Sequence, residues 1–234
     1  MDTNILKVIQ RTHNVKSFRC EPKARVDFTA GQFMKVTLKV NQENQSKYFS
    51  ISNSPTEKGY YEFTKKITES DFSKALDRLK AGDPLTLDLP KGSFTLKEED
   101  KKAAFLSGGI GITPLRSMIQ YAVDMNLKVN IVLLYGNHTE KDIVFREDLD
   151  ALSDHSQNVR IIHTLDSPDI DRNRWRGRTG LINAQMIKEE VPDYQERKFF
   201  ICGPPQMVLA LNKTLKDDLE IQADRIKTEK FSGY

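Results

Sequence analysis

The sequence predicts a two-domain chain in which a β-rich half precedes an α/β half. In the first hundred residues, short runs of alternating apolar and polar residues are separated by Gly, Pro and Asn turns, which is typical of an antiparallel barrel or sandwich. After residue 100, apolar runs alternate with helix-like stretches, which favours a parallel sheet with helices on both faces. Two glycine-rich strings in the second half each follow an apolar run, so a ligand is expected at the carboxyl ends of these strands.

Three strands and one helix are expected in the first half. Residues 33–40 alternate with the period of a half-buried strand, and residues 60–67 are rich in aromatic and β-branched side chains. Residues 85–89 alternate up to Pro90. A helix over residues 73–80 interrupts the strands, with Ser73 as its N-cap.

Five strands and four helices are expected in the second half. The strands cover residues 103–106, 129–135, 159–165, 199–201 and 225–231. The helices cover residues 114–125, 144–152, 183–189 and 205–219. The charged stretch 97–102 separates the two patterns, so we expect one domain over residues 1–98 and a second over residues 99–234.

The two glycine strings run from Ser107 to Pro114 and from Cys202 to Pro205. Glycine lets a ligand approach the backbone, and the helix that follows presents free N–H groups that suit a diphosphate. Thr113 followed by Pro114 fits an N-cap and a first helical residue. Many glycine turns open helices without binding a ligand, and Cys202 alone fits a small buried apolar residue. The two strings together favour a dinucleotide site.

Composition limits the classes of function. The 234 residues are 38% apolar and 29% charged, with a net charge of +3, which does not support nucleic-acid binding. The charge excess lies in residues 1–100 and is compatible with an ordinary solvated surface. Neither an apolar run long enough to span a membrane nor a signal sequence is present, and the two cysteines cannot form a disulfide framework, so a cytoplasmic location is expected.

With these motifs, the chain resembles the ferredoxin–NAD(P) reductase superfamily over nearly its whole length. Besides the two glycine strings, the resemblance rests on Lys47 to Ser52, Gly82-Asp83, Tyr135 to Asn137, Trp175-x-Gly177-x-x-Gly180 and Glu229 to Phe231. It implies a Greek-key β-barrel that binds a flavin and a Rossmann-like sheet of five parallel strands that binds a nicotinamide nucleotide. By the family default the flavin is FAD, with FMN the less favoured alternative.

The resemblance also implies which residues of the first half hold the flavin. Phe49 and Ser50 match the family's aromatic and hydroxyl positions, and Ser50 is expected to reach the reactive ring nitrogen. Lys47 stands where the family has Arg, so it offers charge to the diphosphate without the planar fork of arginine. The full set of expected flavin contacts is Lys47, Tyr48, Phe49, Ser50, Phe63, Thr64, Lys65 and Ser73.

In the second half, the resemblance places Cys202 and Glu229 beside the nicotinamide carbon that gives up the hydride. Either Phe231 or Tyr234 is expected to cover the flavin until the nicotinamide displaces it. The remaining expected nucleotide contacts are Gly108, Gly109, Gly111, Thr113, Pro114, Asn137, Asp166, Gly203, Pro204 and Met207.

The resemblance implies electron transfer between NADH or NADPH and a one-electron carrier, which we expect to be ferredoxin, flavodoxin or an oxygenase component. Asp166 favours NADH because it would repel a 2′-phosphate, whereas arginines between residues 172 and 178 could bind one. His138 is expected to be a surface residue. Two alternatives are a reductase of small acceptors such as free flavin or a ferric chelate, and an electron-transfer subunit of a larger complex. The acceptor and the oligomeric state are left open.

Overall fold

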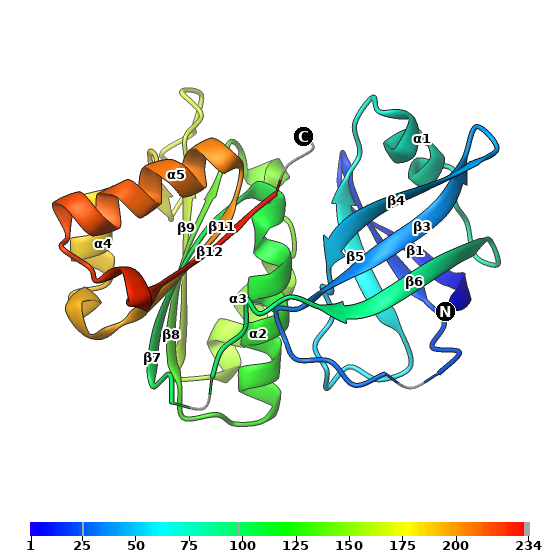
Figure 1. The fold of residues 1–234 in the computed structure, drawn as a ribbon. Coiled ribbons are helices and arrows are strands. Elements are labelled where there is room, and N and C mark those ends of the chain that lie inside the picture. Colours follow the sequence, from blue (N-terminus) through cyan, green and yellow to red (C-terminus); the bar gives the residue numbers. More distant parts are fainter. Residues whose placement is uncertain (25, 98, 232–234) are drawn as a thin grey trace.

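The computed structural model describes residues 1–24, 26–97 and 99–231, and Tyr234 lies outside these residues. Two halves, each built on a sheet, lie side by side, and helix α2 (Ile112–Asp124) stands between the parallel sheet and the barrel (Figure 1). The carboxyl ends of strands β7 (Lys102–Gly108) and β11 (Lys198–Gly203) lie at the upper end of this view, where the last described residues also lie.

The first half is an antiparallel sheet of six strands that curls into a barrel. In chain order its elements are β1 (Asp2–Thr12), β2 (Val15–Cys20), β3 (Phe33–Val40), β4 (Glu43–Ser50), β5 (Tyr61–Lys66), α1 (Asp71–Asp77) and β6 (Pro84–Lys91). The strand order is β4-β3-β6-β1-β2-β5. A single bridge between Ile51 and Phe63 links the two edges, so the barrel is not fully closed. Phe18, Met34 and Val36 are among the fully buried residues at its centre.

The second half is a parallel sheet of six strands in the described residues, and not of five as the sequence predicts. Its strands lie in the order β10-β9-β8-β7-β11-β12. The strands not yet placed are β8 (Asn130–Asn137), β9 (Val159–Leu165), β10 (Arg178–Thr179) and β12 (Ile226–Lys230). The extra strand is β10, which pairs with β9 at the sheet edge through two residues. Two polar residues give no apolar run, so periodicity does not reveal this strand.

Helices cover both faces of the parallel sheet (Figure 1). They are α2, α3 (Arg146–His155), α4 (Ala184–Glu190) and α5 (Pro205–Lys213). Helix α5 continues into a π-helical turn (Thr214–Asp218). Short 3₁₀ turns cover Gly109–Gly111, Glu140–Asp142, Tyr194–Glu196 and Ala223–Arg225. Successive side chains of each strand point to opposite faces of the sheet. Phe105 and Phe200 pack in the cluster with α2 and α3, whereas Leu106 and Ile201 pack with α4 and α5. No helix in the described residues has the length and apolarity to cross a bilayer.

Two expected N-caps differ from the structure. Helix α1 begins at Asp71, and the cap is Ser70, whose hydroxyl accepts a hydrogen bond from the Ser73 N–H. Helix α2 begins at Ile112 because the 3₁₀ turn Gly109–Gly111 already supplies its first bonds, so Thr113 lies inside the helix and donates its hydroxyl proton to the Ile110 carbonyl.

Candidate active site

The two glycine turns at the ends of β7 and β11 pack directly against each other. A Cβ on Gly111 would lie 2.3 Å from the carbonyl oxygen of Cys202. A Cβ on Gly108 or Gly203 would lie 2.4 Å or 2.5 Å from the end of the Met207 side chain. The absence of a side chain at Gly111 is therefore required for backbone packing within the protein, whereas the sequence suggests ligand approach as the reason. At Gly108 and Gly203 an added Cβ would first displace the flexible end of Met207.

Gly109 is the glycine of the first turn that leaves space for a ligand. Its φ is +52°, and an added Cβ would have no neighbour within 4 Å. The Tyr135 hydroxyl donates to the Gly109 carbonyl over 2.9 Å and accepts from the Val144 N–H over 3.3 Å, which fixes the turn from behind. Helix α2 starts immediately after the turn, so its free N–H groups and positive dipole end suit a diphosphate here. The sequence marks Tyr135 as part of a motif of the resemblance, at the end of an apolar strand run, but gives it no role at the site.

Cys202 and Glu229 are brought together by the parallel register of β11 and β12, in which they pair directly. Cys202 is fully buried, and burial followed by the nearby Glu229 charge raises the pKa of its thiol well above the ordinary value. Burial raises the pKa of Glu229 to about 7. The Oε2 atom of Glu229 is buried and has no hydrogen-bond partner in the described part of the chain. Such an unpaired buried oxygen is typical of a site that a ligand completes.

Phe231 and the second glycine turn stand beside this pair. The Phe231 N–H donates to the Gly203 carbonyl over 3.1 Å, and its ring packs on the core cluster that contains Cys202. Pro204 forms the N-cap of α5, whose Met207 fills the space above Gly108. The structure thus brings these expected nicotinamide-side residues to one end of the sheet. Tyr234 is outside the described residues.

On the barrel half, β4 ends at the expected flavin residues. Tyr48 is 62% exposed, and the hydroxyl of Ser50 is buried without a hydrogen-bond partner among the described residues. The Phe49 ring points the other way, into the gap between the barrel edges, where its centroid lies 5.1 Å from that of Phe63 and 6.1 Å from that of Phe72. Tyr48 and Ser50 therefore lie on the face of β4 opposite to Phe49.

Three expected flavin contacts have their side chains turned inward. Phe63 is fully buried in the barrel core. The Thr64 hydroxyl hydrogen-bonds to the hydroxyls of Ser17 and Ser52 over 2.8 Å and 2.9 Å. Ser73 is fully buried, and its hydroxyl accepts from the Thr68 N–H over 2.7 Å. Barrel curvature and the start of α1 therefore turn these three side chains toward partners inside the barrel half.

Three lysines form a basic cluster next to these strands. Burial, and then the charges of Lys66 and Lys47, lower the pKa of Lys65. The part of this shift that comes from neighbouring positive charges would be relieved by a bound anion. Lys47 and Lys65 are therefore candidates for contacts to a diphosphate.

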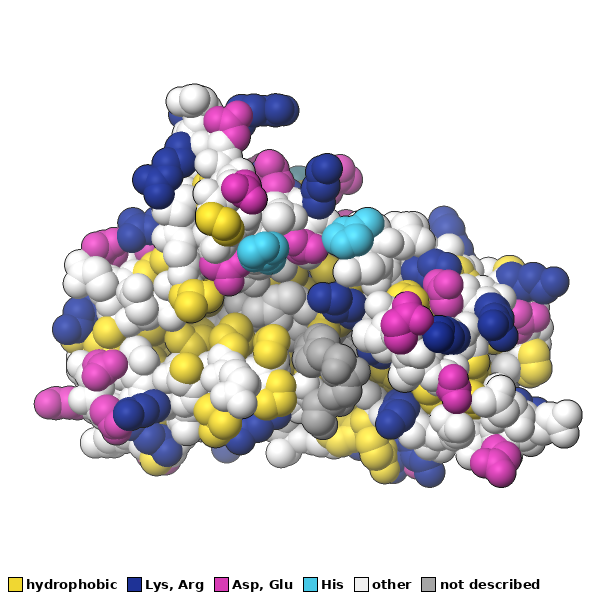
Figure 2. Space-filling model, turned by 90° about the horizontal axis from the view of Figure 1, so that it is seen from above, with side chains coloured by type: hydrophobic (Ala, Val, Ile, Leu, Met, Phe, Trp, Pro, Cys, Tyr) yellow, Lys and Arg dark blue, Asp and Glu magenta, His cyan; other side chains and the backbone are white. Residues whose placement is uncertain are grey.

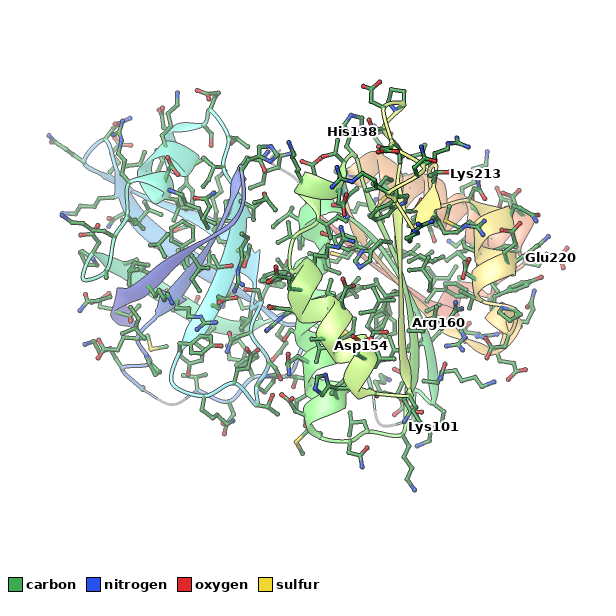
Figure 3. The ribbon with its side chains drawn as sticks, turned by 180° about the vertical axis from the view of Figure 1, so that it is seen from behind. Lys101, His138, Asp154, Arg160, Lys213 and Glu220 are labelled. Atoms are coloured by element: carbon green, nitrogen blue, oxygen red, sulfur yellow. The ribbon has the colours of Figure 1, made fainter. Side chains whose placement is uncertain are left out.

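At the far end of the nucleotide site, β8 and β9 end at Asn137 and just before Asp166. Asn137 is 7% exposed, and neither its amide nitrogen nor its amide oxygen has a hydrogen-bond partner within the described residues. His138 Nδ1 lies 2.8 Å from Asp166 Oδ1, on the exposed surface. His138 lies at the end where the strands finish, opposite Lys101 at the strand beginnings (Figure 3). Asp166 is therefore held at the end of β9 and faces solvent.

The barrel and the nucleotide turns meet at this same end of the molecule. Strand β5 contacts the turn Gly109–Gly111 that precedes α2. From above, apolar side chains gather over the α/β half beside the barrel, and lysines and arginines lie both around the edges and over the barrel half (Figure 2). The β5 edge of the barrel therefore lies beside the first glycine turn.

Comparison with known proteins covers both halves. The family model described as an oxidoreductase FAD-binding domain matches residues 3–96, and the one described as an oxidoreductase NAD-binding domain matches residues 105–213. The chain is 30% identical over 218 residues to the glycine betaine monooxygenase reductase subunit of Chromohalobacter salexigens, covering 91% of this chain and 59% of that protein. It is 28% identical over 242 residues to one subunit of the Na(+)-translocating NADH-quinone reductase of a Marinomonas species, covering 97% of this chain and 59% of that protein.

Among solved structures, the chain resembles a ferredoxin NADP+ reductase from Neisseria gonorrhoeae with bound FAD and NADP. The TM-score is 0.83 at 20% identity, and the match covers 98% of both chains. At this identity the likeness establishes the fold. The chain spans 59% of the length of the two curated relatives, so what those proteins do as a whole is a separate question.

Proposed function

The chain belongs to the ferredoxin–NAD(P) reductase superfamily, and we propose that it takes a hydride from a reduced nicotinamide nucleotide onto barrel-bound FAD and passes the electrons to a one-electron carrier. FAD, when bound, accepts the hydride as two electrons and one proton and returns the electrons one at a time. Each hydride thus reduces two carrier molecules and releases one proton. The protein's task is to hold the two rings in contact and exclude water.

One observation carries the proposal: buried polar atoms without a hydrogen-bond partner among the described residues lie on both halves, at the ends where these halves meet. The Ser50 hydroxyl is on the barrel side, and the Glu229 Oε2 atom is on the sheet side beside Cys202. Leaving such atoms unpaired costs on the order of 1–3 kcal/mol each, which a bound polar heterocycle would remove. The residues present therefore fit a flavin against β4 and a nicotinamide at the end of β11.

Each part of the site has its own proposed role. Ser50 hydrogen-bonds the flavin ring, Cys202 and Glu229 orient the nicotinamide, and Phe231 covers the stacking position. Gly109 and the start of α2 hold the nucleotide diphosphate, and Lys47 and Lys65 hold the FAD diphosphate. Phe63, Thr64 and Ser73 support the flavin site from within the barrel. The remaining proposed contacts are Tyr48, Phe49, Gly108, Gly111, Thr113, Pro114, Asn137, Asp166, Gly203, Pro204 and Met207. The proposed domains are residues 1–98 and 99–234.

NADH is the proposed nucleotide. Asp166 is exposed at the end of β9 and paired with His138, so its charge would accept ribose hydroxyls and repel a 2′-phosphate. Of the nearby arginines, Arg178 is already paired with Glu189 and Glu190 and is poorly placed to serve a phosphate.

For the electron acceptor, we propose a ferredoxin, a flavodoxin or an oxygenase component. Similarity to a monooxygenase reductase subunit supports this class, and similarity to one subunit of a Na(+)-translocating NADH-quinone reductase supports a role within a larger assembly. We propose a cytoplasmic location because Cys20 and Cys202 are both free and buried.

Anaerobic titration tests the proposal. The purified protein is incubated with FAD, freed of excess flavin and mixed with NADH and NADPH in parallel, while the flavin absorbance is followed. We expect near-stoichiometric FAD and complete bleaching, faster with NADH. Failure to retain FAD, or retained FAD that neither nucleotide bleaches, contradicts the proposal. Adding a ferredoxin or free riboflavin to the reduced protein then separates a protein carrier from a small acceptor.

A further inference from the structure

Helix α2 is tied to the barrel segment that directly follows the proposed flavin residue. Arg116 on α2 is 5% exposed, and its Nη1 atom donates to the Ser52 carbonyl over 3.3 Å. The next helix residue, Ser117, donates its hydroxyl proton to the Asn53 carbonyl over 2.7 Å. Ser52 stands two residues after Ser50, and Arg116 stands five residues after Gly111. These bonds therefore join the flavin strand to the helix that begins at the nucleotide turn.

Carboxylates from both halves converge on the Arg116 guanidinium. Glu57 of the barrel forms a two-pronged ion pair with it, in which Nη2 and Oε1 are 3.3 Å apart. Asp148 of α3 accepts from Nη2, also over 3.3 Å. Burial would raise the pKa of Glu57, but the hydrogen bond and charge of Arg116 outweigh it and lower this pKa. The pair is therefore ionised and joins three elements in one place.

A second arginine repeats the contact from the barrel side. Arg11 on β1 pairs with the buried carboxylate of Glu62 over 3.3 Å and with Asp148 over 3.8 Å. Its guanidinium carbon lies 4.7 Å from the ring centre of Phe145, and that of Arg116 lies 5.5 Å from the same centre. Phe145 is buried and has a left-handed φ of 60°, a conformation that a bulky residue keeps only where its surroundings hold it.

We infer that Arg116 is a positioning residue for hydride transfer, because it fixes the distance between the flavin-binding end of β4 and the nucleotide turn that opens α2. The inference rests on the proposed function. Arg116 touches neither proposed ring and acts through the backbone of Ser52 and the carboxylate of Glu57. The rate of hydride transfer falls steeply as the distance between the two reacting rings grows, and a displacement of about 1 Å is enough to lower this rate by about 100-fold.

Single-turnover stopped-flow measurements test the inference. The FAD-loaded protein is mixed anaerobically with increasing NADH or its 4-deuterated form, which gives a limiting reduction rate, an apparent Kd and an isotope effect. For Arg116→Gln we expect at least a tenfold lower limiting rate, an apparent Kd within about threefold, unchanged FAD content and an isotope effect at least as large as that of the natural protein. Arg116→Lys should recover part of the rate, because one ammonium group cannot reach three acceptors as the guanidinium does.

Two further variants keep the test decisive. Glu57→Gln removes one anchor from a partly exposed loop and should lower the limiting rate at least threefold, even if Arg116→Gln does not fold. Arg160→Gln is the matched control, because Arg160 pairs with Glu190 on the opposite face of the α/β half and should leave the rate unchanged (Figure 3). A residue that only stabilises the fold would lower the melting temperature without altering the limiting rate. That result for both Arg116→Gln and Glu57→Gln overturns the inference, whereas failure of NADH to reduce the natural protein overturns the proposed function instead.

Discussion

The nicotinamide side and the flavin side of the proposed site are built in different ways. At the ends of β7 and β11, backbone packs on backbone, and even one added methyl group at Gly111 would overlap the Cys202 carbonyl. At the end of β4, side chains provide the proposed ligand contacts. Ser50 offers a hydroxyl, and the lysines Lys47, Lys65 and Lys66 offer positive charge. Backbone packing sets the shape of the first region without a ligand. In the second region, the affinity for a ligand depends on individual side chains, which other residues could replace. Substitutions should therefore be drastic in the first and graded in the second.

The largest effect is expected for Gly111→Ala. The new Cβ would lie 2.3 Å from the Cys202 carbonyl oxygen, and backbone on both turns would have to move. Overpacking of this kind costs roughly 1–3 kcal/mol and should lower NADH-dependent flavin reduction by about 100-fold. FAD retention should persist, because the barrel is untouched. Thermal melting and stopped-flow reduction measure both effects.

Gly136→Ala is the matched control for Gly111→Ala. An added Cβ at Gly136 would meet its nearest neighbours at 3.7 Å, an ordinary contact distance. Its melting temperature should stay close to that of the natural protein. Equal effects of the two substitutions would show that the interlocked turns are not the special feature of this region.

A smaller effect is expected for Cys202→Ala. The side chain is fully buried and adjacent to Glu229, so its proposed role concerns the nicotinamide alone. We expect a loss of at least about tenfold in hydride transfer, equivalent to about 1.4 kcal/mol of activation free energy, with FAD content unchanged. Cys20→Ala, at a fully buried cysteine of the barrel core, should affect stability and leave the hydride-transfer rate alone. Parallel loss of flavin and rate in Cys202→Ala would indicate a structural cysteine.

The same contrast explains what the sequence could predict. Strand β9 (Val159–Leu165) matches its expected bounds, because β-branched residues such as Val159, Ile161 and Ile162 favour a strand. Strands β1, β2 and β4 are not among the strands that the sequence predicts, because charged and polar residues such as Lys7, Arg11 and Lys16 interrupt their apolar alternation. Local pattern does not show which side of a curved strand faces inward, so the burial of Phe63 and Thr64 could not be predicted. The partner of Arg116 is 59 residues away in the sequence, beyond the reach of any motif.

On the flavin side, Lys65→Met should weaken FAD binding about tenfold, the loss expected for one charge-assisted contact of about 1.4 kcal/mol. Burial lowers the pKa of Lys65 most, and repulsion from Lys66 and Lys47 lowers it further. An anion relieves this repulsion, so the affinity of the natural protein for FAD should also fall with added salt. Fluorescence titration of the apoprotein with FAD measures both. Lys39→Met, an exposed lysine on β3, is the control. A Kd for Lys65→Met equal to that of the control would place the diphosphate elsewhere.

The smallest expected effect is a pH dependence that belongs to the nicotinamide side alone. Burial raises the pKa of Glu229 from its ordinary value of 4.5 to about 7, so the protonated carboxyl is the favoured buried form. A carboxyl whose pKa is raised by folding stabilises the protein fully below pH 4.5, and this contribution is lost as the pH rises from 4.5 to about 7. The Glu229→Gln variant has no such proton to lose, so its melting temperature should exceed that of the natural protein by a few degrees above pH 7, and the difference should shrink toward pH 4.5.

The ionised carboxylate should also favour the positively charged oxidised nucleotide. NAD⁺ should therefore bind the natural protein about threefold more tightly at pH 8 than at pH 6, and the Gln variant equally at both. Melting curves and NAD⁺ titrations across this pH range measure the two effects, and a Gln variant that keeps the full pH dependence would assign it to another group.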